Sequence, residues 1–170
     1  MKRILILFTA LCCALALSSC NGANTGEAPT ADEASPTDEI ILTDEVIPMN
    51  GTKMHVQIAG ASFTATLEDN AAVRELIGMM NAGPVTIDMR DYAGFEKVGA
   101  LGRSLTTDNH QTTTTAGDIV LYNGDQIVMF YGSNAWSYTR IGRIDDLTGW
   151  EEALGSGSIT AVFSLDTDAA

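Results

Sequence analysis

The sequence predicts a mainly β domain, a barrel capped by two short helices, that follows an N-terminal leader and a linker. Three observations predict it. Short segments in which apolar and polar residues alternate recur from residue 51 onward. An Asn123-Gly124 pair separates two strand-like runs, which is the strongest hairpin signal in the chain. A short helical segment precedes one last strand, and at 170 residues the chain has room for one such domain.

Residues 1–19 are typical of a signal peptide. Lys2 and Arg3 form a positively charged start, and residues 4–17 are an apolar run. At 14 residues this run is too short to span a membrane and about right for the apolar region of a signal peptide. We therefore exclude residues 1–19 from the folded domain.

Residues 17–20, Leu-Ser-Ser-Cys, resemble the bacterial lipobox, in which the cysteine is lipidated and becomes the new N-terminus. An ordinary cleavage site followed by an incidental cysteine is the alternative. Cys12 and Cys13 leave with the leader, so Cys20 is the only cysteine that the mature chain keeps and no disulfide is expected. Acylation, palmitate included, would anchor the chain in the cell envelope. Asn21 favours the outer membrane if the source is Gram-negative.

Residues 20–50, which begin with the lipidated cysteine, are predicted to be an acidic, flexible linker. From residue 21 to 50 the segment holds seven Asp and Glu and no Lys or Arg, and it has few large apolar groups before residue 40. Residues 40–46 could add an edge strand to the domain. The whole chain has a net charge of −13, which gives no basic stripe for phosphates and excludes nucleic-acid binding.

Residues 51–170 form the predicted domain. Residues 54–58 and 63–67 each alternate apolar with polar positions and predict a hairpin. A helix is predicted to follow, capped by Asp69 or Asn70 and ended by Gly83-Pro84, with its apolar residues on one face. The alternation then returns for a strand over residues 85–89.

The second half of the domain begins with a Gly-rich, polar stretch over residues 93–117, in which Glu96 and Lys97 are interpreted as a solvated pair. The hairpin around Asn123-Gly124 follows. The remaining elements are predicted as strands over residues 119–122, 127–131, 139–144 and 159–165 and a helix over 147–154.

Two stretches are similar to the bacterial cyclophilin-like domain family. The first is residues 91–99, Asp-Tyr-Ala-Gly-Phe-Glu-Lys-Val-Gly, and the second is residues 117–142, which include the hairpin and the run Ser-Asn-Ala-Trp-Ser-Tyr. The resemblance covers about residues 53–165. It implies a closed, eight-stranded, mostly antiparallel barrel with two short helices.

The resemblance also implies a binding groove. Cyclophilins catalyse rotation about X–Pro bonds with an arginine beside an apolar pocket, and Arg90 precedes Phe95 at the matching spacing, which makes it a candidate catalytic residue. The candidate groove residues are Phe95, Phe130, Trp136 and Tyr138. Val98 replaces the family's glutamine, and Tyr138 stands where a histidine is expected.

Each of these residues also has a structural interpretation. Arg90 could be a surface arginine paired with Asp88 or Asp91. Phe95 and Phe130 could fill the core, as apolar side chains do in small barrels, and the two other aromatic residues could cap the barrel.

Three functions are consistent with the sequence. The first is a non-catalytic module that binds a peptide or small ligand at the cell envelope, and the second is a peptidyl-prolyl isomerase acting on envelope proteins. The third is an accessory lipoprotein that uses its linker or outer wall. No nucleotide or serine-hydrolase motif is present, and His55 and His110 lack metal-ligand spacing, so neither cofactor nor metal is expected. Partners would be the membrane, through Cys20, and proline-containing peptides or envelope proteins, with the chain itself a monomer.

Overall fold

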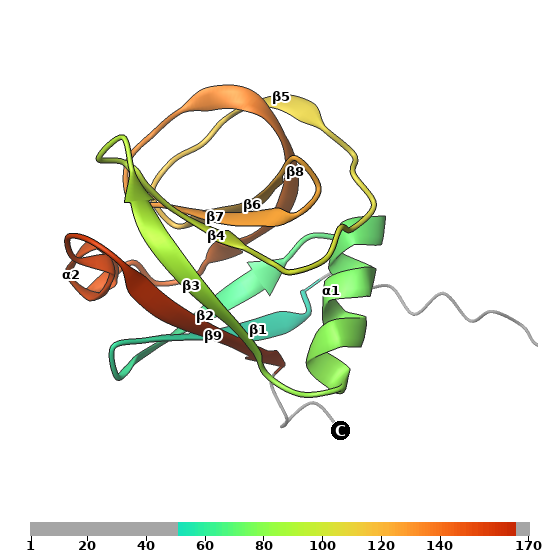
Figure 1. Ribbon diagram of the computed structural model, residues 1–170, viewed down its shortest axis with the longest axis horizontal. Helices are drawn as coiled ribbons and strands as arrows, with labels where there is room; N and C mark the ends of the chain where they lie inside the picture. Colours follow the sequence, from blue (N-terminus) through green and yellow to red (C-terminus); the bar gives the residue numbers. More distant parts are fainter. Residues whose placement is uncertain (1–50, 166–170) are drawn as a thin grey trace, which may run out of the picture. The chain divides into compact units, whose positions relative to one another are not determined.

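The computed structural model describes residues 51–165 as nine strands and two helices (Figure 1). The predicted leader, Cys20 and linker lie outside the described residues. The elements in chain order are β1 Lys53–Ile58, β2 Ala61–Leu67, α1 Ala71–Asn81, β3 Val85–Tyr92, β4 Glu96–Ala100, β5 His110–Thr113, β6 Asp118–Tyr122, β7 Gln126–Phe130, β8 Ala135–Ile144, α2 Trp150–Leu154 and β9 Ile159–Leu165.

Eight of the strands form a closed antiparallel barrel in the order β2-β1-β9-β3-β4-β7-β6-β8, and β8 pairs with β2 to close it. The ninth strand, β5, pairs with the outer part of β8. At the closing seam Gly142 lies opposite Leu67, and a Cβ at Gly142 would lie 2.5 Å from the carbonyl oxygen of Thr66. The close approach of these two strands therefore requires glycine, and the predicted closed barrel is confirmed.

Local sequence signals account for several elements. The turn pairs Ala59-Gly60 and Asn123-Gly124 both have positive φ at both residues, which is the geometry of a tight hairpin turn. Helix α1 begins after Asn70, whose side chain accepts a hydrogen bond of 3.0 Å from the backbone N–H of Val73. Both hairpins and this helix are confirmed.

The sequence analysis assigned no strand to the Gly-rich, polar stretch of residues 93–117, and the structure has β4 and β5 there. The hydrogen bonds of β4 come from its neighbours β3 and β7, and those of β5 come from β8 alone. Strand β8 also begins earlier than predicted, at Ala135, and α2 begins later, at Trp150. The β4–β7 and β5–β8 pairings join residues far apart in the chain, so local propensity did not reveal them. The β3–β4 hairpin is local, with positive φ at both Ala93 and Gly94, and the sequence interpretation missed it.

The apolar residues form two clusters, one on each side of the barrel wall. The main core fills the interior with residues from α1 and from most of the strands, among them Phe163. A smaller outer cluster lies on the opposite face of β4, β6, β7 and β8 and contains Val98, Val120, Val128, Phe130 and Tyr138. This part of the wall is therefore buried on both faces.

Lys97 is fully buried, which corrects its interpretation as half of a solvated pair. Its Nζ donates to Asp91 Oδ1 at 2.8 Å and to the carbonyl oxygens of Gly155 and Gly157 at 2.9 and 2.8 Å, and it lies 5.6 Å from the centre of the Tyr131 ring. All three ammonium hydrogens thus have acceptors. Through its hydrogen bonds to Gly155 and Gly157, Lys97 holds the segment between α2 and β9 against the barrel wall. Within residues 51–165 no helix is long and apolar enough to cross a membrane.

We predict that Lys97→Met lowers the free energy of unfolding by roughly 3–5 kcal/mol, because it leaves the carbonyl groups of Gly155 and Gly157 without their donor and removes the cation that pairs with Asp91. The matched control is Lys53→Met, which removes a half-exposed pair with Asp145 and should cost less than about 1 kcal/mol. Urea unfolding of both variants measures the difference. Equal losses would show that Lys97 is not a buried anchor.

Candidate binding pocket on the outer barrel face

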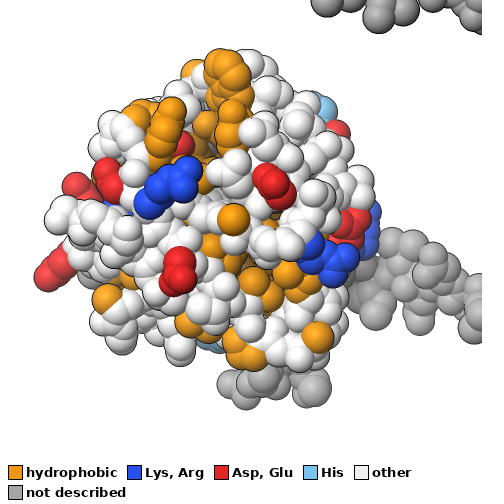
Figure 2. Space-filling model, viewed as in Figure 1, with side chains coloured by type: hydrophobic (Ala, Val, Ile, Leu, Met, Phe, Trp, Pro, Cys, Tyr) orange, Lys and Arg blue, Asp and Glu red, His pale blue; other side chains and the backbone are white. Residues whose placement is uncertain are grey.

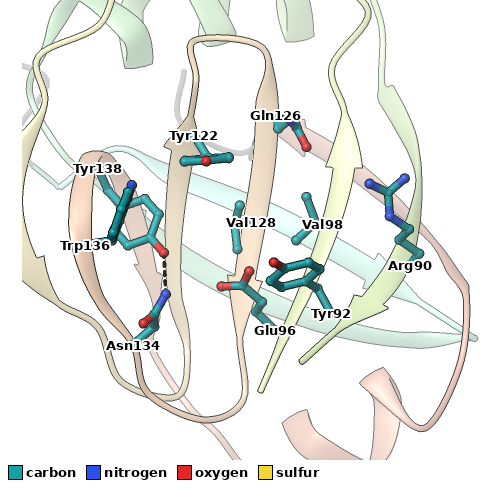
Figure 3. A pocket seen from close by; sticks show the side chains of 10 residues that line it. All are labelled: Arg90, Tyr92, Glu96, Val98, Tyr122, Gln126, Val128, Asn134, Trp136 and Tyr138. Atoms are coloured by element: carbon teal, nitrogen blue, oxygen red, sulfur yellow. Dashed lines mark hydrogen bonds between the residues drawn. The ribbon is translucent and has the colours of Figure 1, made fainter. Parts of the chain in front are cut away.

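A cavity of about 430 Å³ opens on the outer face of the barrel wall (Figure 3). Strands β3, β4, β6 and β7 line one side of it, and β8 with the preceding loop lines the other. In the space-filling view, hydrophobic side chains emerge on this part of the surface beside a basic one (Figure 2). The lining residues are Arg90, Tyr92, Glu96, Val98, Tyr122, Gln126, Val128, Asn134, Trp136 and Tyr138.

The alternation of side chains along the strands explains this composition. Residues that face outward on β4 and β7 include Val98 and Val128, which are both buried and are register partners. They form an apolar floor that belongs to the outer cluster. Tyr92 and Trp136 are each 56% exposed and lie at the rim. The pocket therefore has an apolar floor and an aromatic, amphipathic rim.

Glu96 is the unusual residue of the pocket. It is only 6% exposed, and its Oε2 atom has no hydrogen-bond partner among the described residues. In Figure 3 its carboxyl group turns into the pocket next to Tyr92, its register partner on β3. Burial raises the pKa of Glu96 to about 7. A carboxyl group that titrates near neutrality and lacks a partner is a feature of functional sites.

Arg90 lies at one edge of the pocket, opposite Val98 in the strand register (Figure 3). It is exposed and forms no ion pair with any residue in the described range 51–165. Asp91 is held by Lys97, and Asp88 accepts a hydrogen bond from Thr160 at 2.7 Å. The guanidinium group of Arg90 is therefore available to a ligand.

The other predicted groove residues divide into two groups. Trp136 and Tyr138 line the pocket, and the Tyr138 hydroxyl accepts a hydrogen bond of 2.9 Å from Asn134. Phe95 and Phe130 do not line it. Their rings stack with centroids 6.5 Å apart in the outer cluster, and the Phe130 ring contacts Tyr138 edge to face. The structure places them as support for the pocket wall.

Sequence reasoning missed Glu96 as a pocket residue. The available signal was the unbroken apolar run of residues 127–131, which indicates a strand buried on both faces. The outward residues of the strand beside it would then be covered as well. Recognising β4 as that neighbour required the long-range pairing.

A second hollow of about 410 Å³ lies beside α2, between the β1–β2 turn and residues 148–153. Its only charged lining residue is Glu152, which is exposed. Among residues 51–165 no group of three or more His, Cys, Asp or Glu side chains is placed to hold a metal ion. The pocket that contains Glu96 is accordingly the candidate site.

The barrel and its outer pocket define the class of protein. Residues 56–164 match the model of the cyclophilin-like family, and the chain belongs to that family. It is also similar to a hypothetical protein from Archaeoglobus fulgidus, known from a solution structure, with 15% identity, a TM-score of 0.48 and coverage of 68% of this chain and 95% of that chain. No curated protein matches the sequence.

We predict that Glu96→Gln stabilises the protein at pH 8 but not at pH 4 or below. The pKa of Glu96 is about 7 when folded and 4.5 ordinarily, so between these values the folded state binds more protons than the unfolded state. Stability from this group is therefore lost as the pH rises from about 4.5 through 7. The gain at pH 8 has an upper limit of roughly 3 kcal/mol.

Urea unfolding of wild type and Glu96→Gln at both pH values measures this effect. The exposed Glu152→Gln variant removes the same charge and should leave stability unchanged within about 0.5 kcal/mol. A difference between wild type and Glu96→Gln that does not vary with pH would contradict the prediction.

Proposed function

We propose that this protein is a lipid-anchored, non-catalytic binding module of the cell envelope, whose outer pocket holds a peptide segment or a small organic ligand. The observation that carries the binding role is the pocket itself. It joins an apolar floor of Val98 and Val128 to Arg90, which has no ion pair within residues 51–165, and to buried Glu96, whose Oε2 has no hydrogen-bond partner there. Polar groups that converge on an apolar cavity are typical of ligand sites.

The proposed location rests on the sequence. The lipobox-like residues 17–20 support acylation of Cys20, and the acidic segment that follows supports a flexible connection to the domain. The outer membrane is the expected site if the source is Gram-negative. Incorporation of an alkyne-tagged palmitate by the wild-type chain, and its loss in Cys20→Ser, tests the anchor.

Binding is tested with the peptide acetyl-Ala-Ala-Pro-Phe-amide and the mature chain, residues 20–170 with Cys20→Ser. We predict that amide resonances around Val98, Val128 and Tyr122 shift on titration. Trp136→Ala should weaken binding about tenfold, because Trp136 is an exposed aromatic side chain at the pocket rim. Leu147→Ala removes another exposed apolar side chain, away from the pocket, and should leave the affinity unchanged. Shifts confined to surfaces outside the pocket would reject this site.

A second candidate function, peptidyl-prolyl isomerase, is favoured by the position of Arg90 in the pocket, where its guanidinium group has no ion pair within residues 51–165. The same peptide separates the two functions, because uncatalysed exchange takes tens to hundreds of seconds. A binding module leaves that exchange rate unchanged. Acceleration that disappears in a folded Arg90→Ala variant would assign the isomerase instead.

A further inference from the structure

We propose that the Glu96 end of the pocket binds a cationic nitrogen, an ammonium or guanidinium group, carried by the ligand. The inference rests on the proposed binding function and specifies the chemistry of the ligand. Its basis is the buried Glu96 carboxyl group, which faces the pocket with Oε2 unpartnered among the described residues.

Within residues 51–165, Glu96 lacks the positive partner that a buried carboxylate requires. Removing a carboxylate from water is expensive unless an opposite charge or hydrogen-bond donors replace the water. Arg90 is the one cationic side chain among the pocket residues, and it lies at one edge of the pocket, one two-residue repeat away from Glu96 along the β3–β4 pair (Figure 3). Lys97 is adjacent in sequence, but it lies on the other face of β4 with all its donors engaged. A ligand cation would supply the missing partner.

The aromatic side chains favour the same ligand class. Four of the ten lining residues are aromatic, and they come from three different strands. The faces of such rings attract cations, most strongly where water is excluded. The four residues are Tyr92, Tyr122, Trp136 and Tyr138.

The net negative charge of the domain also favours a cationic ligand. Residues 51–165 contain thirteen Asp and Glu against seven Lys and Arg. This excess attracts cations and disfavours anions at the pocket mouth. An anionic ligand would find Arg90 alone to receive it, and it would also meet Glu96.

Among the pocket residues, Glu96 is the group expected to change charge near neutral pH, so its titration should set the pH dependence of ligand binding. The groups that face it across the pocket are Arg90 and Tyr92 on β3, Tyr122 on β6 and Tyr138 on β8, while β7 contributes uncharged residues. Arginine and tyrosine do not ordinarily change charge near pH 7. A bound cation favours the carboxylate form of Glu96, so binding should release a proton at neutral pH and should weaken on acidification.

The test compares acetyl-Ala-Lys-Pro-Phe-amide with its uncharged norleucine counterpart, using residues 20–170 with Cys20→Ser. At pH 8 we expect the lysine peptide to bind about tenfold more tightly in a calorimetric titration, with this preference shrinking at pH 5. At pH 7, titrations in buffers of different ionisation enthalpy should show release of up to about half a proton. A calorimetric titration with butylamine alone shows whether a free amine is sufficient for binding or whether the cation must be carried by a peptide side chain.

Glu96→Gln should abolish both the preference for lysine and the proton release, whereas Glu152→Gln should preserve both. Glu96→Gln is near-isosteric and removes a buried charge, so it is expected to fold. Equal affinity for the lysine and norleucine peptides would overturn this inference while leaving a peptide-binding pocket in place. A lysine preference that persists in Glu96→Gln would also overturn it. Failure of every peptide to bind would instead reject the proposed function.

Discussion

Closure of the barrel between β8 and β2 is the constraint on which the rest of the structure depends. Once the ring of strands is closed, alternation fixes which side chains of each strand face the interior and which face outward. Along β4, β6 and β7 the outward face is also buried, under the outer cluster and the pocket. Tyr122 and Gln126 remain partly exposed at the pocket, but a charged residue that is buried on either face of this wall needs a partner.

Lys97 meets this requirement within the described residues, and Glu96 does not. They are neighbours on β4, so they project to opposite faces, and both are buried. Lys97 has three acceptors and holds the α2–β9 connection against the wall. Glu96 keeps an oxygen without a partner in the described structure. One strand thus supplies both a satisfied structural charge and an unsatisfied charge that faces the pocket, and the second is where a ligand can contribute.

The sequence predicted the elements whose signals are local. The Asn123-Gly124 turn, the Asn70 cap and the alternating strands were found because each depends on residues close in the chain. Strand β5 was missed because its residues are polar and mostly exposed and it pairs with β8 alone. In the pocket, Arg90 and the two β8 aromatics followed from the family resemblance. Glu96 could not, because its burial is created by residues far away in the chain.

The register of β3 and β4 gives the pocket a polarity. Arg90 pairs with Val98 and Tyr92 pairs with Glu96, so the two opposite charges are separated by one two-residue repeat, about 6.6–6.8 Å along the strands. An extended peptide has the same repeat. A segment that placed a cationic side chain at Glu96 would therefore place the residue two positions away beside Arg90. A cationic side chain placed beside Arg90 instead would meet a like charge and leave Glu96 without a partner, so the two charges would select the position at which the cation binds.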